Sequence, residues 1–389
     1  MAVFWYGLVP IAGALVKRLK WRQFRIRFDE LRLCPVLNYG NYRQQDGNGA
    51  GGKTPAVFRF AGNFESVTDG QTLWIRGEDL TVPVSLKNAE TYLLPMQKKE
   101  GAAEMFDPGD EAPEKIRWER VSALTEGVRV FVGGLLAYQD GRCGFISPKE
   151  KPLTVILYDG PDQSLAEMVV RAGRLRGDYW NSVTPYSLIF GALCQILMAV
   201  LFISRPAFRL TVIVAFIALF IPLYPMIPPG LLFTVIYRRL TWMARTLLIN
   251  GGLTRLPLCY LASQGNGNRR GKKAPLNDSC LLPDGELYGF IRIAELPPQA
   301  HEGKIPLLLP KQSKPGGPWL VFGALVPGED LPSRPADPFA TFGILPDGVQ
   351  VIARHNTIMA YTLETLAWLT LLAGIGLNIF FLRMVSVLL

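Results

Sequence analysis

The stretch that decides the fold is YSLIFGALCQILMAVLFI, residues 186–203, in which no Asp, Glu, Lys or Arg occurs. The surrounding charge-free region extends from Tyr179 to Ser204. Because a helix of about 20 mostly apolar residues crosses the hydrocarbon core of a bilayer, this stretch predicts a membrane-spanning helix.

Three other stretches have the same character. Leu210–Tyr237 and Thr365–Leu382 are free of charged residues, and Met1–Val16 is shorter but also apolar. The whole chain, of 389 residues with 49% hydrophobic and 19% charged residues, is too apolar to be disordered. We therefore expect four transmembrane helices, which lie in residues 1–16, 163–204, 210–237 and 358–383.

Basic residues next to the apolar stretches set the expected topology. Ala12-Gly13-Ala14 resembles a signal-peptide cleavage site, but no basic residue precedes the apolar part, which favours an uncleaved anchor. Because basic flanks stay in the cytoplasm, we expect a multi-pass protein of the bacterial cell membrane with cytoplasmic soluble domains. The inverted topology is the alternative. The residues expected at the membrane surface are Lys17, Arg18, Lys20, Arg22, Arg25, Arg27, Arg238, Arg239 and Arg245.

This basic set is suited to contact anionic lipid. The net charge of +9 also fits nucleic acid, but a basic cluster held at a bilayer is poorly placed to follow a duplex. The expected partners are therefore the lipid bilayer and other membrane or membrane-associated proteins, and no nucleic acid.

Two segments of the chain share an ordered series of matches. Tyr6-Gly-Leu-Val-Pro10 corresponds to Tyr224-Pro-Met-Ile-Pro228, and Lys17-Arg-Leu-Lys-Trp21 corresponds to Arg238-Arg-Leu-Thr-Trp242. Apolar runs can match by chance. The shared order nevertheless favours an internal repeat, each copy made of a membrane helix, a basic segment, a β-rich domain and a second membrane helix.

The two soluble parts, residues 17–162 and 238–357, have the pattern of β-rich domains, in which β-branched and aromatic runs alternate with Gly, Asp and Pro. About five short strands per domain fit an OB-like small barrel, and a small sandwich is the alternative. The expected fold class is therefore an α+β membrane protein with four transmembrane helices and two repeated β-rich domains. The expected strands are Val57–Phe60, Thr72–Arg76, Leu80–Leu86, Val128–Leu136 and Leu153–Tyr158, then Leu287–Ile293, Ile305–Leu309, Trp319–Leu325 and Val349–Ala353.

An amphipathic helix is expected just before the second span. Ser164-Leu-Ala-Glu167 forms a capping box, and apolar residues recur at helical spacing up to Arg176. Further along, Pro327–Pro338 is a Pro-rich connection.

Gly47–Thr54 matches the phosphate-binding pattern G-x-x-x-x-G-K-[ST]. That site needs a buried strand before the loop and a helix after it. Polar residues precede the motif and Pro55 follows it, so we interpret it as a linker and expect neither nucleotide nor any other cofactor.

Prolines break the expected third span. Pro222, Pro225, Pro228 and Pro229 remove backbone donors from its second half, which must kink or end there. Broken helices sometimes line substrate paths, but few ionisable residues accompany this break, which favours a structural hinge.

Residues suited to catalysis or metal binding are scarce. The sequence contains two histidines, His301 and His355, and five scattered cysteines without a C-x-x-C pair. Neither a metal site nor a nucleophile with its base can be recognised, so we expect no catalytic and no metal-binding residues.

A series of short motifs runs through the end of the first domain: Trp118-Glu119, Leu124-Thr-Glu-Gly127, Val130-Phe-Val-Gly133, Asp140-Gly141, Ile146-Ser-Pro148 and Val155-Ile-Leu157. Residues 118–205 thereby resemble the beside-a-membrane domain of membrane-anchored E3 ligases and of bacterial relatives. The resemblance implies a β-rich domain held against a bilayer. The RING of those ligases needs a Cys/His cluster that this sequence lacks, so ligase activity is not implied.

These patterns together predict a non-enzymatic multi-pass membrane scaffold or accessory subunit that presents two β-rich domains to protein partners. The alternative is a transporter or channel component that uses the proline-broken third span.

Overall fold

The structure is a computed structural model that describes residues 4–46, 56–68, 71–94, 114–116, 128–139, 142–174, 179–203, 230–261, 278–301, 304–308 and 318–388. The chain divides into two compact units. The helical unit comprises Met1–Arg22, Leu175–Leu248 and His355–Leu389, and the β unit comprises Gln23–Arg174 and Ile249–Arg354.

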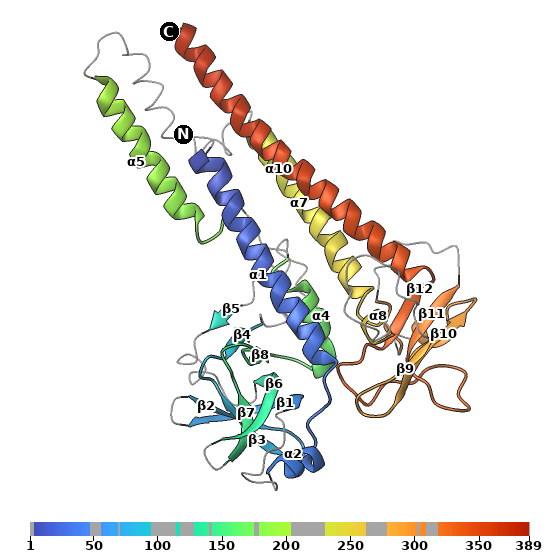
Figure 1. Cartoon of the computed structure of the whole chain (residues 1–389). Helices are drawn as coiled ribbons and strands as arrows, with labels where there is room; N and C mark the ends of the chain where they lie inside the picture. Colours follow the sequence, from blue (N-terminus) through green and yellow to red (C-terminus); the bar gives the residue numbers. More distant parts are fainter. Residues whose placement is uncertain are drawn as a thin grey trace. The chain divides into compact units, whose positions relative to one another are not determined.

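Long helices make up the helical unit, and three of them continue into the β unit (Figure 1). A short π-helix, η1, precedes the first of them. Their bounds are η1 Phe4–Leu8, α1 Val9–Arg32, α5 Thr184–Ile203, α7 Gly230–Leu253 and α10 Val349–Leu388.

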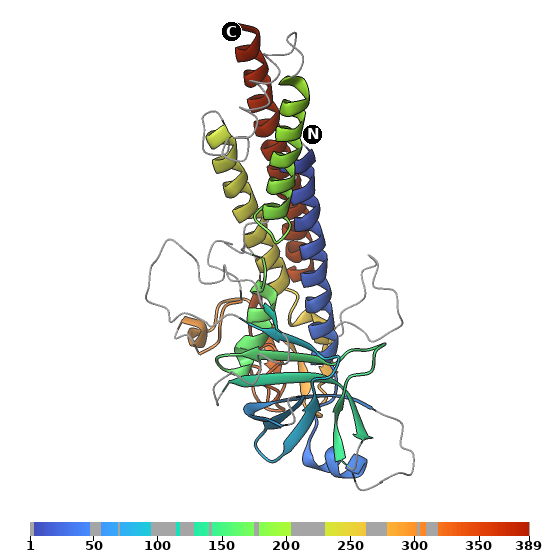
Figure 2. The same ribbon diagram turned by 90° about the vertical axis from the view of Figure 1, so that its left-hand side faces the viewer.

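Small residues allow the helices of this unit to approach closely. A Cβ added to Gly191 of α5 would lie 2.8 Å from the Tyr6 ring, and one added to Gly374 of α10 would lie 2.7 Å from Phe233 of α7. Close backbone approach at small residues is a common way to pack apolar helices. Figure 2 shows α5 (green) beside the N-terminal half of α1 (blue).

Among the helices in the described residues, one is long and apolar enough to cross a membrane, over Val349–Leu377 of α10. The prediction of four transmembrane helices, and with it the multi-pass location, is therefore wrong. The apolar start of α1 is too short, because the helix continues through the basic segment to Arg32. In α5, whose bounds are Thr184–Ile203, the apolar helix that qualifies among the described residues is Thr184–Cys194, which is shorter than a span.

Charged residues exclude α7 as well, because Arg238, Arg239 and Arg245 interrupt its apolar sequence. The part of the predicted third span before Gly230, including Pro222, Pro225, Pro228 and Pro229, lies outside the described residues. The phosphate-binding pattern at Gly47–Thr54 also lies outside them.

The first lobe of the β unit is an eight-stranded sheet with strand order β1-β2-β3-β7-β6-β8-β4-β5. Because β1 also pairs with β6, the strands β1, β2, β3, β7 and β6 close into a ring. The β3–β7 and β4–β8 pairs are parallel, and the remaining pairs are antiparallel. The strands are β1 Ala56–Thr68, β2 Thr72–Arg76, β3 Thr81–Ser85, β4 Glu90–Leu93, β5 Glu114–Ile116, β6 Arg129–Gln139, β7 Arg142–Ile146 and β8 Thr154–Tyr158.

Apolar side chains from these strands fill the first lobe. β8 is buried along its whole length, as expected for a strand with neighbours on both sides and covered faces. Two helices complete the lobe, α2 Tyr39–Asp46 and α4 Asp162–Arg171. The helix α4 begins before Ser164, whose hydroxyl donates to the Pro161 carbonyl, so the predicted capping box is wrong.

The second lobe is a smaller antiparallel sheet with strand order β12-β11-β10-β9. Its four described strands do not close into a ring, unlike those of the first lobe. Tyr260, Tyr288 and Phe322 lie in its core. Its elements are α8 Leu258–Leu261, β9 Ser279–Leu281, β10 Leu287–Ile293, α9 Pro298–His301, β11 Trp319–Ala324 and β12 Gly343–Pro346.

Both sheets contain a similar antiparallel triplet, β1-β6-β8 in the first and β10-β11-β12 in the second. In the first triplet Gly133 of β6 faces Arg59 of β1, and in the second Gly323 of β11 faces Gly289 of β10. The similar segments Val130-Phe-Val-Gly133 and Leu320-Val-Phe-Gly323 thus lie in the middle strand of each triplet.

Candidate functional site

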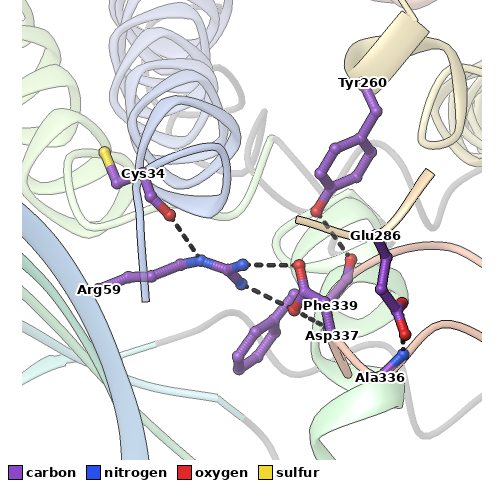
Figure 3. A network of polar contacts seen from close by, with 7 residues as sticks. All are labelled: Cys34, Arg59, Tyr260, Glu286, Ala336, Asp337 and Phe339. Atoms are coloured by element: carbon purple, nitrogen blue, oxygen red, sulfur yellow. Dashed lines mark hydrogen bonds and ion pairs between the residues drawn. The ribbon is translucent and has the colours of Figure 1, made fainter. Parts of the chain in front are cut away.

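The candidate site is a buried charged junction that joins the two lobes inside the β unit (Figure 3). Arg59 of β1 and Asp337, in the loop before β12, have side chains that are 1% and 0% exposed. Arg59 Nη1 donates to Asp337 Oδ1 at 3.0 Å, and Nη2 donates to Oδ2 at 2.6 Å. This two-bond geometry is the strongest form of the arginine–carboxylate contact.

The surroundings of the pair engage its remaining polar atoms. Arg59 Nε donates to the Cys34 carbonyl at 2.8 Å, and the Phe339 amide donates to Asp337 Oδ1 at 3.0 Å. The Phe339 ring centroid lies 5.3 Å from the Arg59 guanidinium carbon. A buried ion pair is tolerated when all its hydrogen-bonding groups are used in this way.

Further contacts order the loop that carries Asp337. The Tyr260 hydroxyl donates to the Phe339 carbonyl at 3.2 Å, and the Ala336 amide donates to Glu286 Oε2 at 2.9 Å. The Phe339 ring also meets Phe131 of β6 edge-on, with centroids 5.1 Å apart. The loop of the second lobe is thus packed directly on the first lobe.

A second buried arginine, Arg32 at the end of α1, belongs to the same neighbourhood. It is 0% exposed, donates through Nη2 to the Leu256 carbonyl at 3.0 Å, and lies over the Tyr260 ring at 4.9 Å. Tyr260 therefore contacts Arg32 through its ring, and through its hydroxyl it contacts the carbonyl of Phe339, whose ring lies beside Arg59.

Burial changes the titration of the groups around the junction. It raises the pKa of Tyr260 to about 12, against the opposing charge of Arg32. Burial also raises the pKa of Asp284, and the nearby Asp337 charge adds to that effect. Both shifts favour the neutral form, so the ionic character of the junction is concentrated in its arginines and Asp337.

The arrangement holds the two lobes of the β unit together. The Arg59 and Asp337 side chains hydrogen-bond to each other, and Arg59 also donates to the Cys34 carbonyl. In the part of the chain that the structure describes, no group of three or more His, Cys, Asp or Glu side chains could hold a metal ion.

The structure places the predicted membrane-surface residues of α1 in two classes. Arg18 pairs with Glu364 of α10, Arg25 donates to the Ala172 carbonyl at 3.0 Å, and Arg27 pairs with Glu90. Lys20 and Arg22 are exposed, whereas Lys17 is half-buried. Arg18, Arg25 and Arg27 therefore make polar contacts within the protein.

On α7, Arg238 and Arg239 are exposed and Arg245 is buried. Of the predicted membrane-surface residues, those that are exposed are therefore Lys20 and Arg22 of α1 together with this pair.

Sequence reasoning missed both members of the central pair. A signal existed for Arg59, a single charged residue between Phe58 and Phe60 in an apolar strand. Asp337 gave none, because it lies in the Pro-rich tract Pro327–Pro338.

Comparisons with protein-family models, with curated proteins and with solved structures find no match to this chain. The resemblance of residues 118–205 to the beside-a-membrane domain therefore stays a prediction.

Proposed function

We propose that the protein is a non-enzymatic scaffold that is anchored to a bilayer through α10 and presents its two β-rich lobes to protein partners. The observation that carries this proposal is the Arg59–Asp337 junction, which joins the lobes through a buried ion pair with two hydrogen bonds. A body made rigid in this way can present surfaces from both lobes in a fixed arrangement.

The anchor is proposed from the composition of α10 and its place in the chain. Two residues separate the end of β12 at Pro346 from the first residue of α10, Val349. The apolar stretch Val349–Leu377 is long enough to cross the hydrocarbon core. Of its most apolar 18-residue segment, 28% is buried within the protein. The exposed Leu366 and Leu369 are then available to contact lipid.

The strand order of the first lobe supports an OB-like barrel. A closed ring β1-β2-β3-β7-β6, with β3 and β7 parallel, is the arrangement of a five-stranded OB barrel, and β4, β8 and β5 extend it on one side. The shared triplets of the two lobes support an internal repeat that has diverged. The proposed beside-a-membrane resemblance fits the same picture of a β-rich domain near lipid.

Exposed basic residues would add affinity for anionic lipid. Each Lys or Arg near such a surface contributes about 1 kcal/mol, and Lys20, Arg22, Arg238 and Arg239 are exposed. Neutralising Lys20 and Arg22 should weaken binding to phosphatidylglycerol vesicles more than binding to phosphatidylcholine vesicles.

The anchor is tested by flotation of the full-length protein with vesicles. Wild type should float, and Leu366→Arg combined with Leu369→Arg should remain at the bottom, because charged side chains are costly in the hydrocarbon core. The matched control places the same change at the exposed Leu281 and Leu287 of the second lobe, and it should float normally. Wild-type protein that stays at the bottom would contradict the anchor.

The scaffold role is tested by crosslinking in intact membranes. Photo-crosslinkers at the exposed Tyr138 of the first lobe and Leu281 of the second should capture defined proteins. The same probe at Trp242, exposed on α7, is the control for lipid-phase or random capture. Identical captures at all three positions would argue against specific docking by the lobes.

A further inference from the structure

We propose that Arg32 binds a small oxyanion of the phosphate class at the junction of the two lobes. The Arg32 side chain is 0% exposed, yet one nitrogen of its guanidinium, Nη2, donates a hydrogen bond within the described residues, to the Leu256 carbonyl at 3.0 Å. Nε and Nη1 are buried and meet no acceptor there. Unsatisfied buried donors on a charged group are costly and are rare in native proteins.

The charge balance of the junction points in the same direction. Among the residues that the structure describes there, the fully buried ionic ones are the two arginines, Arg32 and Arg59, and one carboxylate, Asp337. Arg59 engages both oxygens of that carboxylate, which leaves none for Arg32. Asp29, one turn earlier on α1, attracts the Arg32 charge through space but accepts no hydrogen bond from it.

A second buried polar atom without a hydrogen-bond partner in the described residues lies in the second lobe. The Thr341 hydroxyl oxygen is buried and has no partner in the described part of the chain. Tyr288 connects the two places, because its hydroxyl donates to the Thr341 carbonyl at 2.6 Å and its pKa responds to the Arg32 charge. Tyr288 thus contacts the Thr341 backbone and lies within electrostatic reach of Arg32.

The chemistry of these donors selects the ligand class. Arginine presents several N–H groups in a planar arrangement that fits phosphate and sulfate oxygens, and a threonine hydroxyl can donate to a further oxygen. Water could satisfy the hydrogen bonds but carries no negative charge, and Asp29 acts on Arg32 only through space. The Tyr260 ring and the carbonyls at the end of α1 supply partial negative charge only.

The test is thermal unfolding of the full-length protein in detergent, with inorganic phosphate replacing chloride at constant ionic strength. Phosphate at about one hundred times its dissociation constant should raise the midpoint by roughly 3–5 °C. Equilibrium dialysis with radiolabelled phosphate should give one bound phosphate per chain. Glycerol phosphate and vesicles containing phosphatidic acid, tested in parallel, separate free phosphate from a lipid headgroup as the source.

The deciding variant is Arg32→Met, which keeps the length of the side chain and removes its charge. Without phosphate its midpoint should equal or exceed that of wild type, since an uncompensated buried charge is gone, and the response to phosphate should disappear. Arg22→Gln, an exposed arginine of the same helix, is the matched control and should keep the full response.

Two results would overturn the proposal: no phosphate response in wild type, or an undiminished response in Arg32→Met. If Arg32→Met does not fold, Thr341→Val decides instead. It should fold and bind phosphate about tenfold more weakly, because one hydrogen bond to a charged ligand is lost. Unchanged phosphate affinity in Thr341→Val would then count against the site.

Discussion

The guanidinium of Arg59 and the carboxylate of Asp337, 278 positions apart in the chain, form two parallel hydrogen bonds of 3.0 and 2.6 Å inside the β unit. Both side chains are almost fully buried, so neither charge can turn to solvent when its partner is removed. Removing one member of the pair should therefore destabilise the protein much more than replacing both members with apolar residues.

Replacing one member of this pair should destabilise the protein strongly. Arg59→Met or Asp337→Leu alone should lower the free energy of unfolding by about 3–5 kcal/mol, because each leaves an uncompensated buried charge. The double variant should be far closer to wild type. Urea unfolding followed by tryptophan fluorescence measures all three.

The control for this cycle is the exposed Arg171–Glu167 pair on α4. Glu167→Gln should change stability by about 0.5 kcal/mol or less, as is usual for surface pairs. If Arg59→Met were as mild as Glu167→Gln, the junction would not hold the lobes together.

A glycine in the first lobe should resist enlargement. A Cβ added to Gly62 of β1 would lie 2.4 Å from the Arg76 carbonyl oxygen, a backbone atom fixed by the β1–β2 pairing. Gly62→Ala should therefore cost about 1–3 kcal/mol through forced backbone shifts. Thermal unfolding of purified protein measures the change.

The matched control is Gly376→Ala on α10, where the added Cβ would meet nothing within 4 Å. Alanine is the better helix former, so this change should be neutral or stabilising by up to about 1 kcal/mol. Equal effects at the two glycines would mean that the close approach at Gly62 does not govern stability.

The stability of the β unit should fall at alkaline pH because of Tyr260. Burial raises its pKa from 10.0 to about 12, so below pH 10 the residue is neutral in both the folded and unfolded states. Between pH 10 and about 12 the unfolded state alone loses the proton, which favours unfolding by roughly 2–3 kcal/mol in total. Tyr260→Phe should reduce the slope of stability against pH in this window, whereas Tyr39→Phe, at an exposed tyrosine, should leave it unchanged.

Asn181 should be needed for the contact between α1 and α5 in the helical unit. Its Nδ2 donates to the Pro10 carbonyl at 2.9 Å, and its Oδ1 accepts from the Val183 amide at 2.9 Å. Asn181→Ala should cost about 1–3 kcal/mol, since buried backbone groups lose their partners. Ser182→Ala, at the exposed neighbouring position, should have little effect on the melting temperature measured in detergent.

Local sequence pattern was sufficient to place most strands. The predicted strands Thr72–Arg76 and Leu287–Ile293 coincide with β2 and β10, and Leu153–Tyr158 contains β8. Such runs are short, apolar and bounded by turn residues, so the information that forms them is local.

Local sequence pattern gave the wrong secondary structure where a neighbouring helix extended into a predicted strand. Val349–Ala353 was predicted as a strand from its β-branched residues but forms the first turn of α10, after Gly348 with a φ of +78°. The long apolar helix that follows outweighs the weak strand preference of these residues. The predicted number of membrane helices was wrong for a related reason. A helix need not end where an apolar run meets charged residues, and α1 continues through its basic segment to Arg32.

The junction could not be derived from the sequence, because its members come from distant parts of the chain. No periodicity links Arg59 in a strand to Asp337 in a proline-rich loop, and the pairing exists only once both lobes have folded. The same holds for Arg32. That its Nε and Nη1 meet no acceptor among the described residues becomes visible only when its neighbours in the fold are known.

The spacing between Arg59 and Asp337 also imposes an order on biosynthesis. At roughly 5–20 residues per second, the ribosome needs about 14–56 s to make the 278 positions between them. Throughout that interval the nascent first lobe carries an arginine whose acceptor does not yet exist, so the face that receives the second lobe has to stay hydrated or be shielded by a chaperone. The first lobe can therefore complete its packing at Arg59 only after the second lobe has been synthesised.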